Sequence, residues 1–189
     1  MIKPNRILAI INPISGVGSK SRIPELLADA YNSREEELLI TYTKGEGHAT
    51  RLVKEAIEND IDSIIAVGGD GTINEIASAL HGSQVKMGII PKGSGNGLAR
   101  ALNLPLSSDA EAVRVITEGH TTAIDTGLVD GKPFFCTCGV GFDAEMTKRY
   151  AETSRRGLIT YIKAAIDEYI AFRPQQYRIT IDGEIIETK

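Results

Sequence analysis

Short apolar runs alternate along the first part of the chain with segments whose apolar residues recur at helical spacing. The runs are rich in β-branched residues and predict buried strands over residues 6–11, 38–42, 61–67 and 86–90. Apolar residues at i, i+3, i+4 and i+7 predict helices in residues 23–31, 52–57, 72–80, 98–102 and 111–116. Strands and helices in regular alternation are typical of an α/β fold, so we predict a doubly wound, mostly parallel sheet.

After Gly119 the pattern changes from helical to alternating. Residues 123–129 and 134–138, and then 177–181 and 184–186, predict two hairpins, with Asp-Gly turns at 130–131 and 182–183. A long amphipathic helix is predicted between them, over residues 158–172. We therefore predict an α/β domain over residues 1–120 and the first part of a β-rich domain, an incomplete β-sandwich, over residues 121–189. The last strand would keep an open edge, which indicates a chain cut inside this domain and would allow pairing with a second copy.

Composition and charge exclude several classes of protein. Apolar residues make up 42% and charged residues 24% of the chain, as in a soluble globular protein. The formal net charge is −4, so we expect no nucleic-acid partner. We also expect no transmembrane segment, because no apolar run approaches the roughly 20 residues of a membrane span, and a cytoplasmic location follows. Cys136 and Cys138 lie two residues apart in a strand-like segment, so we expect them to be half-buried packing residues and not a metal site or a disulfide.

Three glycine-rich turns follow predicted strands and precede predicted helices. They contain Gly16 and Gly18, residues 68–71, and residues 93–97. Exposed amide N–H groups at such turns, together with the positive end of the next helix, bind anions. Open α/β sheets bind ligands beyond the carboxyl ends of their strands, so three such turns at one edge predict a phosphate site.

Two capping boxes are expected at helix starts, at Thr72 with Glu75 and at Ser108 with Glu111. The first places Asp70 between a strand and the helix predicted to begin at Thr72. An aspartate there would repel a bare phosphate, but it suits a phosphate that carries Mg²⁺, or a hydroxyl that needs a proton acceptor. The pattern therefore favours a nucleotide site with chemistry; the alternative is a tight connection with no role beyond folding.

The motifs together resemble the diacylglycerol kinase catalytic domain family, whose relatives include the bacterial soluble lipid kinases and the sphingosine and ceramide kinases. They are Asn12-Pro13 with Gly16 and Gly18, residues 68–75, residues 93–100, and Ile124-Asp125 followed by residues 139–144. The Gly-Gly-Asp-Gly portion alone is shared with NAD kinases and, more loosely, with phosphofructokinases, so the first domain is expected to have an NAD kinase/phosphofructokinase-like sheet.

The resemblance implies an enzyme that transfers the γ-phosphate of ATP to a lipid hydroxyl at the membrane surface, with ATP and Mg²⁺ as cofactors. The acceptor would be diacylglycerol-like or sphingoid. Asp70 is implied as the catalytic residue, and Asp70 and Asp125 as metal ligands. The residues implied in binding the nucleotide are Asn12, Gly16, Gly18, Thr43, Gly68, Gly69, Asp70, Gly71, Thr72, Ile73, Asn74, Ser94, Gly95 and Asn96.

Two departures from the family pattern bear on activity. Many bacterial members carry an aspartate where this chain has Gly97, and they place a later Asp-Gly-Glu segment whose aspartate is taken as the general base. Asp182-Gly183-Glu184 has the same three residues but lies much earlier in the chain than the family's segment, and we interpret it as a turn between strands. This fragment is therefore expected to be inactive by itself. An NAD kinase-like enzyme and a non-catalytic nucleotide-binding module remain as alternatives.

Overall fold

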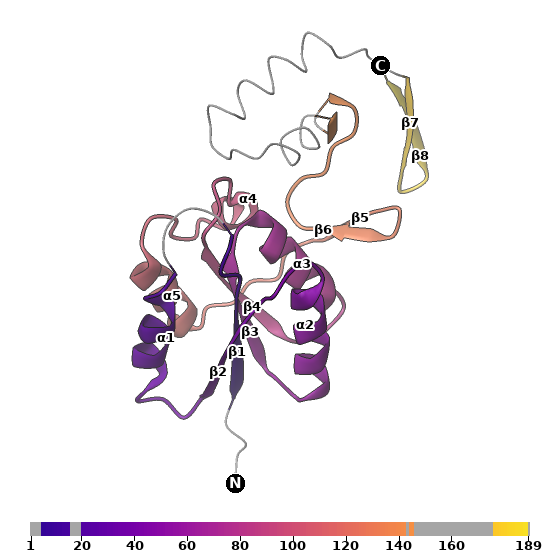
Figure 1. The fold of residues 1–189 in the computed structure, drawn as a ribbon. Helices are drawn as coiled ribbons and strands as arrows, with labels where there is room; N and C mark the ends of the chain where they lie inside the picture. Colours follow the sequence, from indigo (N-terminus) through magenta and orange to yellow (C-terminus); the bar gives the residue numbers. More distant parts are fainter. Residues whose placement is uncertain (1–4, 16–19, 143, 146–175, 189) are drawn as a thin grey trace. The chain divides into compact units, whose positions relative to one another are not determined.

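The computed structural model describes residues 5–15, 20–142, 144–145 and 176–188 of the chain (Figure 1). The chain divides into two compact units, Met1–Cys136 and Thr137–Lys189. The first unit extends past the domain boundary predicted near residue 120, because it includes the first predicted hairpin. The predicted helix over residues 158–172 lies outside the described residues.

The first unit is built on a parallel four-stranded sheet, as predicted. Its strands are β1 (Arg6–Ile11), β2 (Glu37–Tyr42), β3 (Ser63–Gly68) and β4 (Lys86–Pro91), in the order β2-β1-β3-β4. Parallel neighbours need a crossover that passes over a face of the sheet, so both faces of the central strands are covered. This is why β1 and β3 consist of continuous apolar runs instead of alternating ones.

Helices cover both faces of this sheet. The elements α1 (Ile23–Tyr31) and α5 (Asp109–Glu118) lie on one side, whereas α2 (His48–Glu58) and α3 (Asp70–Leu80) lie on the other (Figure 1). A short helix, α4 (Gly97–Ala101), follows the loop after β4. Among the described residues, no helix combines the length and apolar character needed to cross a membrane.

Alternating residues of one strand supply two separate apolar cores. Ile64 and Ala66 of β3 face the core formed with α2 and α3, while Ile65 and Val67 face the core formed with α1 and α5. All four side chains are buried. The doubly wound architecture predicted from the pattern is therefore confirmed.

Two antiparallel hairpins follow the sheet in the chain. The first joins β5 (Gly127–Val129) to β6 (Lys132–Phe134), and the second joins β7 (Tyr177–Ile181) to β8 (Glu184–Thr188). Their turns have positive φ at both central residues, 48° and 73° at Asp130 and Gly131, and 49° and 90° at Asp182 and Gly183. Two such residues in succession characterise type I′ turns, so the interpretation of both Asp-Gly pairs as turns is confirmed.

The prediction for the cysteines was wrong. Cys136 and Cys138 are exposed free thiols, not half-buried packing residues. They follow β6, which ends at Phe134, and the alternating pattern that suggested a buried face does not continue into a strand there.

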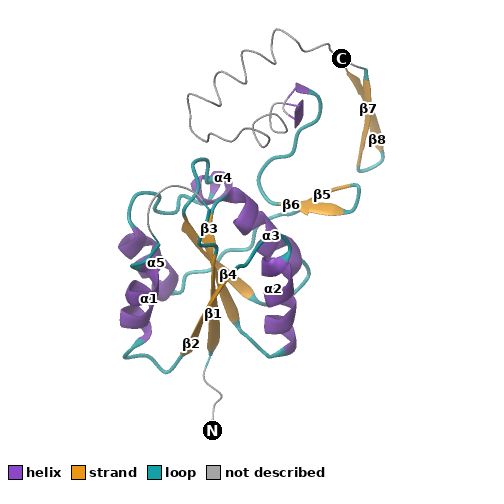
Figure 2. Ribbon diagram, in the orientation of Figure 1, coloured by secondary structure: helices purple, strands orange, loops and turns teal. Residues whose placement is uncertain are grey.

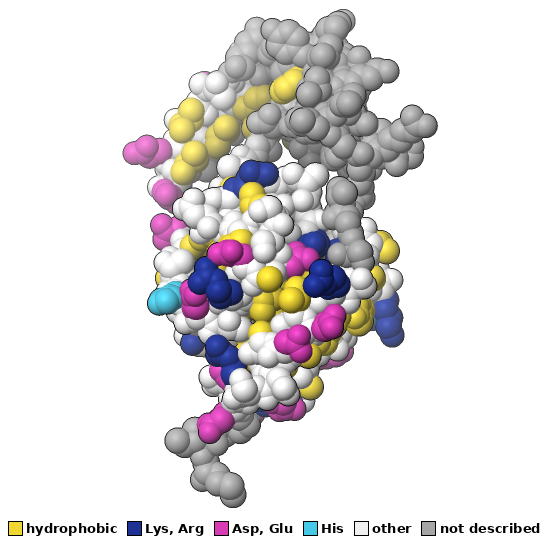
Figure 3. All heavy atoms as spheres, turned by 90° about the vertical axis from the view of Figure 1, so that its left-hand side faces the viewer, with side chains coloured by type: hydrophobic (Ala, Val, Ile, Leu, Met, Phe, Trp, Pro, Cys, Tyr) yellow, Lys and Arg dark blue, Asp and Glu magenta, His cyan; other side chains and the backbone are white. Residues whose placement is uncertain are grey.

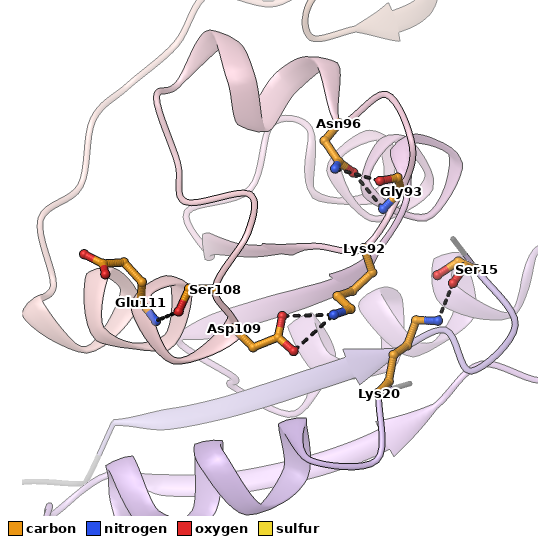
Figure 4. Close-up of polar contacts among 8 residues, drawn as sticks. All are labelled: Ser15, Lys20, Lys92, Gly93, Asn96, Ser108, Asp109 and Glu111. Atoms are coloured by element: carbon orange, nitrogen blue, oxygen red, sulfur yellow. Dashed lines mark hydrogen bonds and ion pairs between the residues drawn. The ribbon is translucent and has the colours of Figure 1, made fainter. Parts of the chain in front are cut away.

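The capping box predicted at Ser108 is confirmed in its serine half. Ser108 precedes α5, and its hydroxyl accepts a hydrogen bond from the Glu111 amide at 3.2 Å (Figure 4). We expect Ser108→Ala to lower the free energy of unfolding by about 1 kcal/mol, because one amide of the first turn loses its partner. Urea denaturation would measure the loss, with the exposed neighbour Ser107→Ala as the matched control. Equal losses in both variants would contradict the assignment.

Candidate active site

The loops that follow β1, β3 and β4 are held side by side at one end of the sheet (Figure 2). Main-chain hydrogen bonds continue the pairing of the strands into the loops. The Asn12 amide donates to the Val67 carbonyl at 3.0 Å, and the Lys92 amide donates to the Gly68 carbonyl at 2.7 Å. At the end of β2, the Thr43 amide donates to the Ile11 carbonyl at 2.9 Å. The predicted convergence of the loops at the carboxyl edge is thus present in the described part of the chain.

Asp70 joins the loop after β3 to the loop after β4. Its Oδ2 accepts a hydrogen bond from the Asn96 amide at 2.8 Å, and its Oδ1 accepts one from the Gly97 amide at 2.6 Å. A carboxylate at the start of a helix satisfies amides that have no partner within the helix, here those that open α4. Each carboxylate oxygen has a further lone pair, and the residue is exposed, so Asp70 retains the capacity to bind a cation or a proton.

Asn96 shapes the loop that Asp70 holds. Its Oδ1 accepts from the Gly93 amide at 2.7 Å, and its Nδ2 donates to the Gly93 carbonyl at 2.8 Å (Figure 4). The residue is only 5% exposed and has a φ of 54°, a left-handed conformation that asparagine tolerates better than most residues. The side chain predicted to contact the nucleotide is therefore engaged within its own loop.

Several glycines of the two loops are required by the packing of one loop on the other. A Cβ at Gly93 would lie 2.8 Å from the Gly69 Cα, and a Cβ at Gly69 would lie 3.2 Å from the Gly93 Cα. A Cβ at Gly95 would lie 2.9 Å from the Asp70 Oδ2. Gly71 differs, because among the described residues a Cβ there would meet no atom within 4 Å beyond its own neighbours in the helix. Contacts within the described part of the chain therefore do not account for a glycine at position 71.

Asn12 connects the loop after β1 to α3. Its Nδ2 donates to the Thr72 hydroxyl at 2.8 Å, and its Oδ1 accepts from the Ile14 amide at 3.1 Å. Thr72 is buried and packs on the backbone of Gly68, where an added Cβ would lie 2.6 Å from the threonine Cβ. Both Asn12 and Thr72 therefore stabilise the relative positions of the loops.

The capping box predicted from Thr72 and Glu75 was wrong. The helix α3 begins at Asp70, after an extended Gly69, so its N-cap residue has no side chain to form a cap. Glu75 instead accepts hydrogen bonds from the neighbouring helix α2, at 2.9 Å from the Thr50 amide and 3.3 Å from the Thr50 hydroxyl. Glu75 thus caps α2 instead of its own helix, because α2 packs beside α3.

Two lysines near the loops were given no role by sequence reasoning. Lys92 follows β4 and pairs with Asp109, its Nζ lying 3.0 Å and 3.1 Å from the two carboxylate oxygens. Lys20 precedes α1, and its ammonium donates to the carbonyls of Pro13, at 3.4 Å, and Ser15 (Figure 4). Burial, and next the charge of Lys92, lower the pKa of Lys20. Their adjacency to glycine turns was the signal in the sequence.

The remaining predicted residues are placed unevenly. Gly16 and Gly18 lie outside the described residues. Thr43 is buried, and Ile73 is 2% exposed in the core, so the isoleucine side chain is directed away from any ligand at the surface. Asn74, Ser94 and Asp125 are exposed. Within the described ranges, no three histidine, cysteine or acidic residues lie close enough to share a metal ion.

Comparison with known proteins is consistent with this geometry. Residues 6–129 match the diacylglycerol kinase catalytic domain. The chain is 30% identical to a diacylglycerol kinase of Bacillus subtilis, covering 96% of this chain and 61% of the relative. It is 28% identical to a diacylglycerol kinase of Mycobacterium tuberculosis, covering 94% of this chain and 60% of the relative. The crystal structure of a diacylglycerol kinase from Bacillus anthracis superposes with a TM-score of 0.72 and 31% identity, covering all of this chain and 62% of that one.

The chain belongs to the diacylglycerol kinase catalytic domain family. It spans about three fifths of the length of these named relatives.

We expect Asp70→Asn to lower the free energy of unfolding by about 1 kcal/mol. An asparagine side chain offers a single acceptor oxygen, so one of the two amides that Asp70 now satisfies would lose its partner. Thermal denaturation would measure the change, with Asp29→Asn on the exposed surface of α1 as the control for loss of one negative charge. An unchanged melting temperature would show that the link between the loops contributes nothing to stability.

Proposed function

We propose that this chain supplies the nucleotide-binding part of an ATP-dependent lipid kinase, which transfers the γ-phosphate of ATP to a hydroxyl of a diacylglycerol-like or sphingoid lipid. The observation that carries the proposal is the position of Asp70, an exposed carboxylate held between two glycine loops at the carboxyl edge of a parallel sheet. Membership of the family supports it, as do the relatives named diacylglycerol kinase.

Phosphoryl transfer depends on in-line positioning and on cancellation of the charge on the phosphoryl oxygens, more than on covalent chemistry by the protein. Loops whose mutual positions are held by Asp70 and Asn12 would meet the first requirement, and Asn96 stabilises the shape of the loop after β4. Amides of residues 68–71 and of the loop after β4 supply part of the second. The nucleotide contacts proposed at Gly16, Gly18 and Thr43 would extend the same surface to the ends of β1 and β2.

Mg²⁺ fits the residues present, because Asp70 keeps lone pairs on both carboxylate oxygens and is exposed. The ion would neutralise charge on the phosphates. We propose Asp70 as its principal protein ligand and Asp125, an exposed residue before β5, as a second. The protein would be cytoplasmic and would bind its lipid substrate at the membrane surface. Self-association through the exposed β7–β8 hairpin is part of the proposal, since Ile181, Ile185 and Ile186 are exposed there.

Gly71→Ala offers the sharpest test of nucleotide binding. We expect the melting temperature to stay equal or to rise, because alanine favours a helix over glycine and no atom of the described residues obstructs its Cβ. We expect affinity for Mg-ATP to fall by about tenfold or more, because the methyl group would occupy the space that the phosphates approach; the size of this loss corresponds to about one charge-assisted hydrogen bond.

Calorimetric titration with Mg-ATP would measure the affinity. Ser78→Ala, later in the same helix, is the control for altered helix propensity. Equal affinities in the two variants would refute a phosphate site at the start of α3.

We also propose that residues 1–189 bind Mg-ATP without phosphorylating lipid. Asp182, the alternative proton acceptor by motif, occupies the first position of a two-residue hairpin turn. Transfer from radiolabelled ATP to diacylglycerol, to sphingosine and to NAD would be measured for this chain, with the Bacillus subtilis diacylglycerol kinase as the positive control for lipid transfer. Transfer at a rate comparable to that of the control would refute this part of the proposal, and transfer to NAD instead would point to the NAD kinase-like alternative.

A further inference from the structure

Lys20 is a half-buried cation whose partners are neutral. Its ammonium donates to two main-chain carbonyls, those of Pro13 and Ser15. Among the described residues no carboxylate forms an ion pair with it, and residues 16–19, which precede it, carry no charged side chain. An ammonium has three donors, so one remains for another acceptor.

Lys92 places a second cation close to the first. Its side chain is 13% exposed and is paired with Asp109, whose single negative charge balances one of the two lysines. The charge of Lys92 acts on Lys20 strongly enough to contribute to the lowered pKa of Lys20, after the larger effect of burial. The three side chains therefore carry a net charge of +1 in a partly desolvated place, which is unfavourable until an anion is bound.

The two lysines come from opposite ends of the set of loops already described. Lys20 belongs to the connection between β1 and α1, and Lys92 begins the loop after β4. Because β3 lies between β1 and β4 in the sheet, the pair flanks the turn that holds residues 68–71 on the side of α1 and α5. Figure 4 shows the Lys92 side chain directed toward Asp109 and the Lys20 side chain directed toward Ser15.

We propose that Lys20 and Lys92 form an anion subsite that binds one phosphoryl group. Lys20 would supply its remaining donor, and Lys92 would add its charge while staying paired with Asp109. On the face over α1 and α5, basic and acidic side chains are intermixed, without a broad basic surface (Figure 3). That distribution suits one small anion, whereas nucleic acid would require a basic stripe.

The phosphoryl group has two candidate sources, a terminal phosphate of the nucleotide or a separate phosphate. Assignment to the nucleotide rests on the proposed function, but the subsite itself does not. Titrations with inorganic phosphate, with Mg-ATP and with adenosine separate these cases, because adenosine presents the base and sugar without a phosphate.

Lys20→Met is the first variant. We expect affinity for inorganic phosphate and for Mg-ATP to fall by about tenfold or more, as for the loss of a hydrogen bond to a charged group. Affinity for adenosine should not change. Lys86→Met, an exposed lysine at the amino end of β4, is the matched control and should leave all three affinities unchanged. Lys20→Arg, which keeps the charge, should restore most of the binding.

Asp109→Asn should change the affinity for phosphate in the direction opposite to Lys20→Met. The substitution removes the compensating charge, so affinity for inorganic phosphate should rise by about two- to fivefold, as expected for one charge acting through partly exposed surroundings. The same variant loses the ion pair with Lys92 and should be less stable. A residue with a purely structural role would not lower stability and tighten anion binding together.

The outcomes separate this subsite from the nucleotide site. If Mg-ATP binds and Lys20→Met changes neither affinity, the subsite is refuted and the proposed function stands. If inorganic phosphate binds in a manner that depends on Lys20 but Mg-ATP does not bind, the subsite stands and the nucleotide proposal fails. Competition between phosphate and Mg-ATP would identify the nucleotide as the source, and independent binding would identify a separate phosphate. If neither ligand binds at millimolar concentration, both are refuted.

Discussion

The carboxylate of Asp70 bridges two loops that leave neighbouring strands, and the arrangement of the site depends on this bridge. Each oxygen accepts one main-chain hydrogen bond, from Asn96 and from Gly97. One negative charge thus caps a helix and is also the group available to bind a cation. A carboxylate can do both because it has more acceptor positions than the protein fills, and because it stays exposed. A structural role and the proposed chemical role therefore fall on the same side chain.

Close packing between the loops explains most of their glycines. Gly69 and Gly93 approach each other so nearly that either Cβ would crowd the other backbone, and Gly95 lies against Asp70. Glycine-rich turns of this kind are commonly attributed to the approach of phosphate. At Gly71, where no described atom beyond its own helix lies within 4 Å of an added Cβ, the approach of phosphate is the role that we propose. Glycines of one motif can therefore be required for different reasons, some by loop packing and others by the approach of a ligand.

The charge distribution around the loops is balanced at some positions and not at others. Lys92 has a carboxylate partner in Asp109, whereas Lys20 is held by neutral carbonyls. A partly buried cation beside another cation is unfavourable in the absence of a ligand, and binding of an anion would reverse this. The edge of the sheet that collects the strand ends also collects amides, a carboxylate and two ammonium groups, which is the set of groups that a magnesium-bound phosphate would require.

Sequence alone determined the four strands of the parallel sheet, most of the helices, the two Asp-Gly turns and the serine cap of α5, because these follow from local periodicity and from backbone preferences of a few residues. It also predicted that the loops after these strands gather at one edge of the sheet, because parallel strands have their carboxyl ends at the same edge. Only the tertiary structure decided that Glu75 caps α2 and not its own helix, that Asp70 accepts hydrogen bonds from the loop after β4, and that Lys20 lies near Lys92. The physical reason is that these contacts join residues whose distance depends on the packing of separate elements, whereas a motif records only neighbours along the chain.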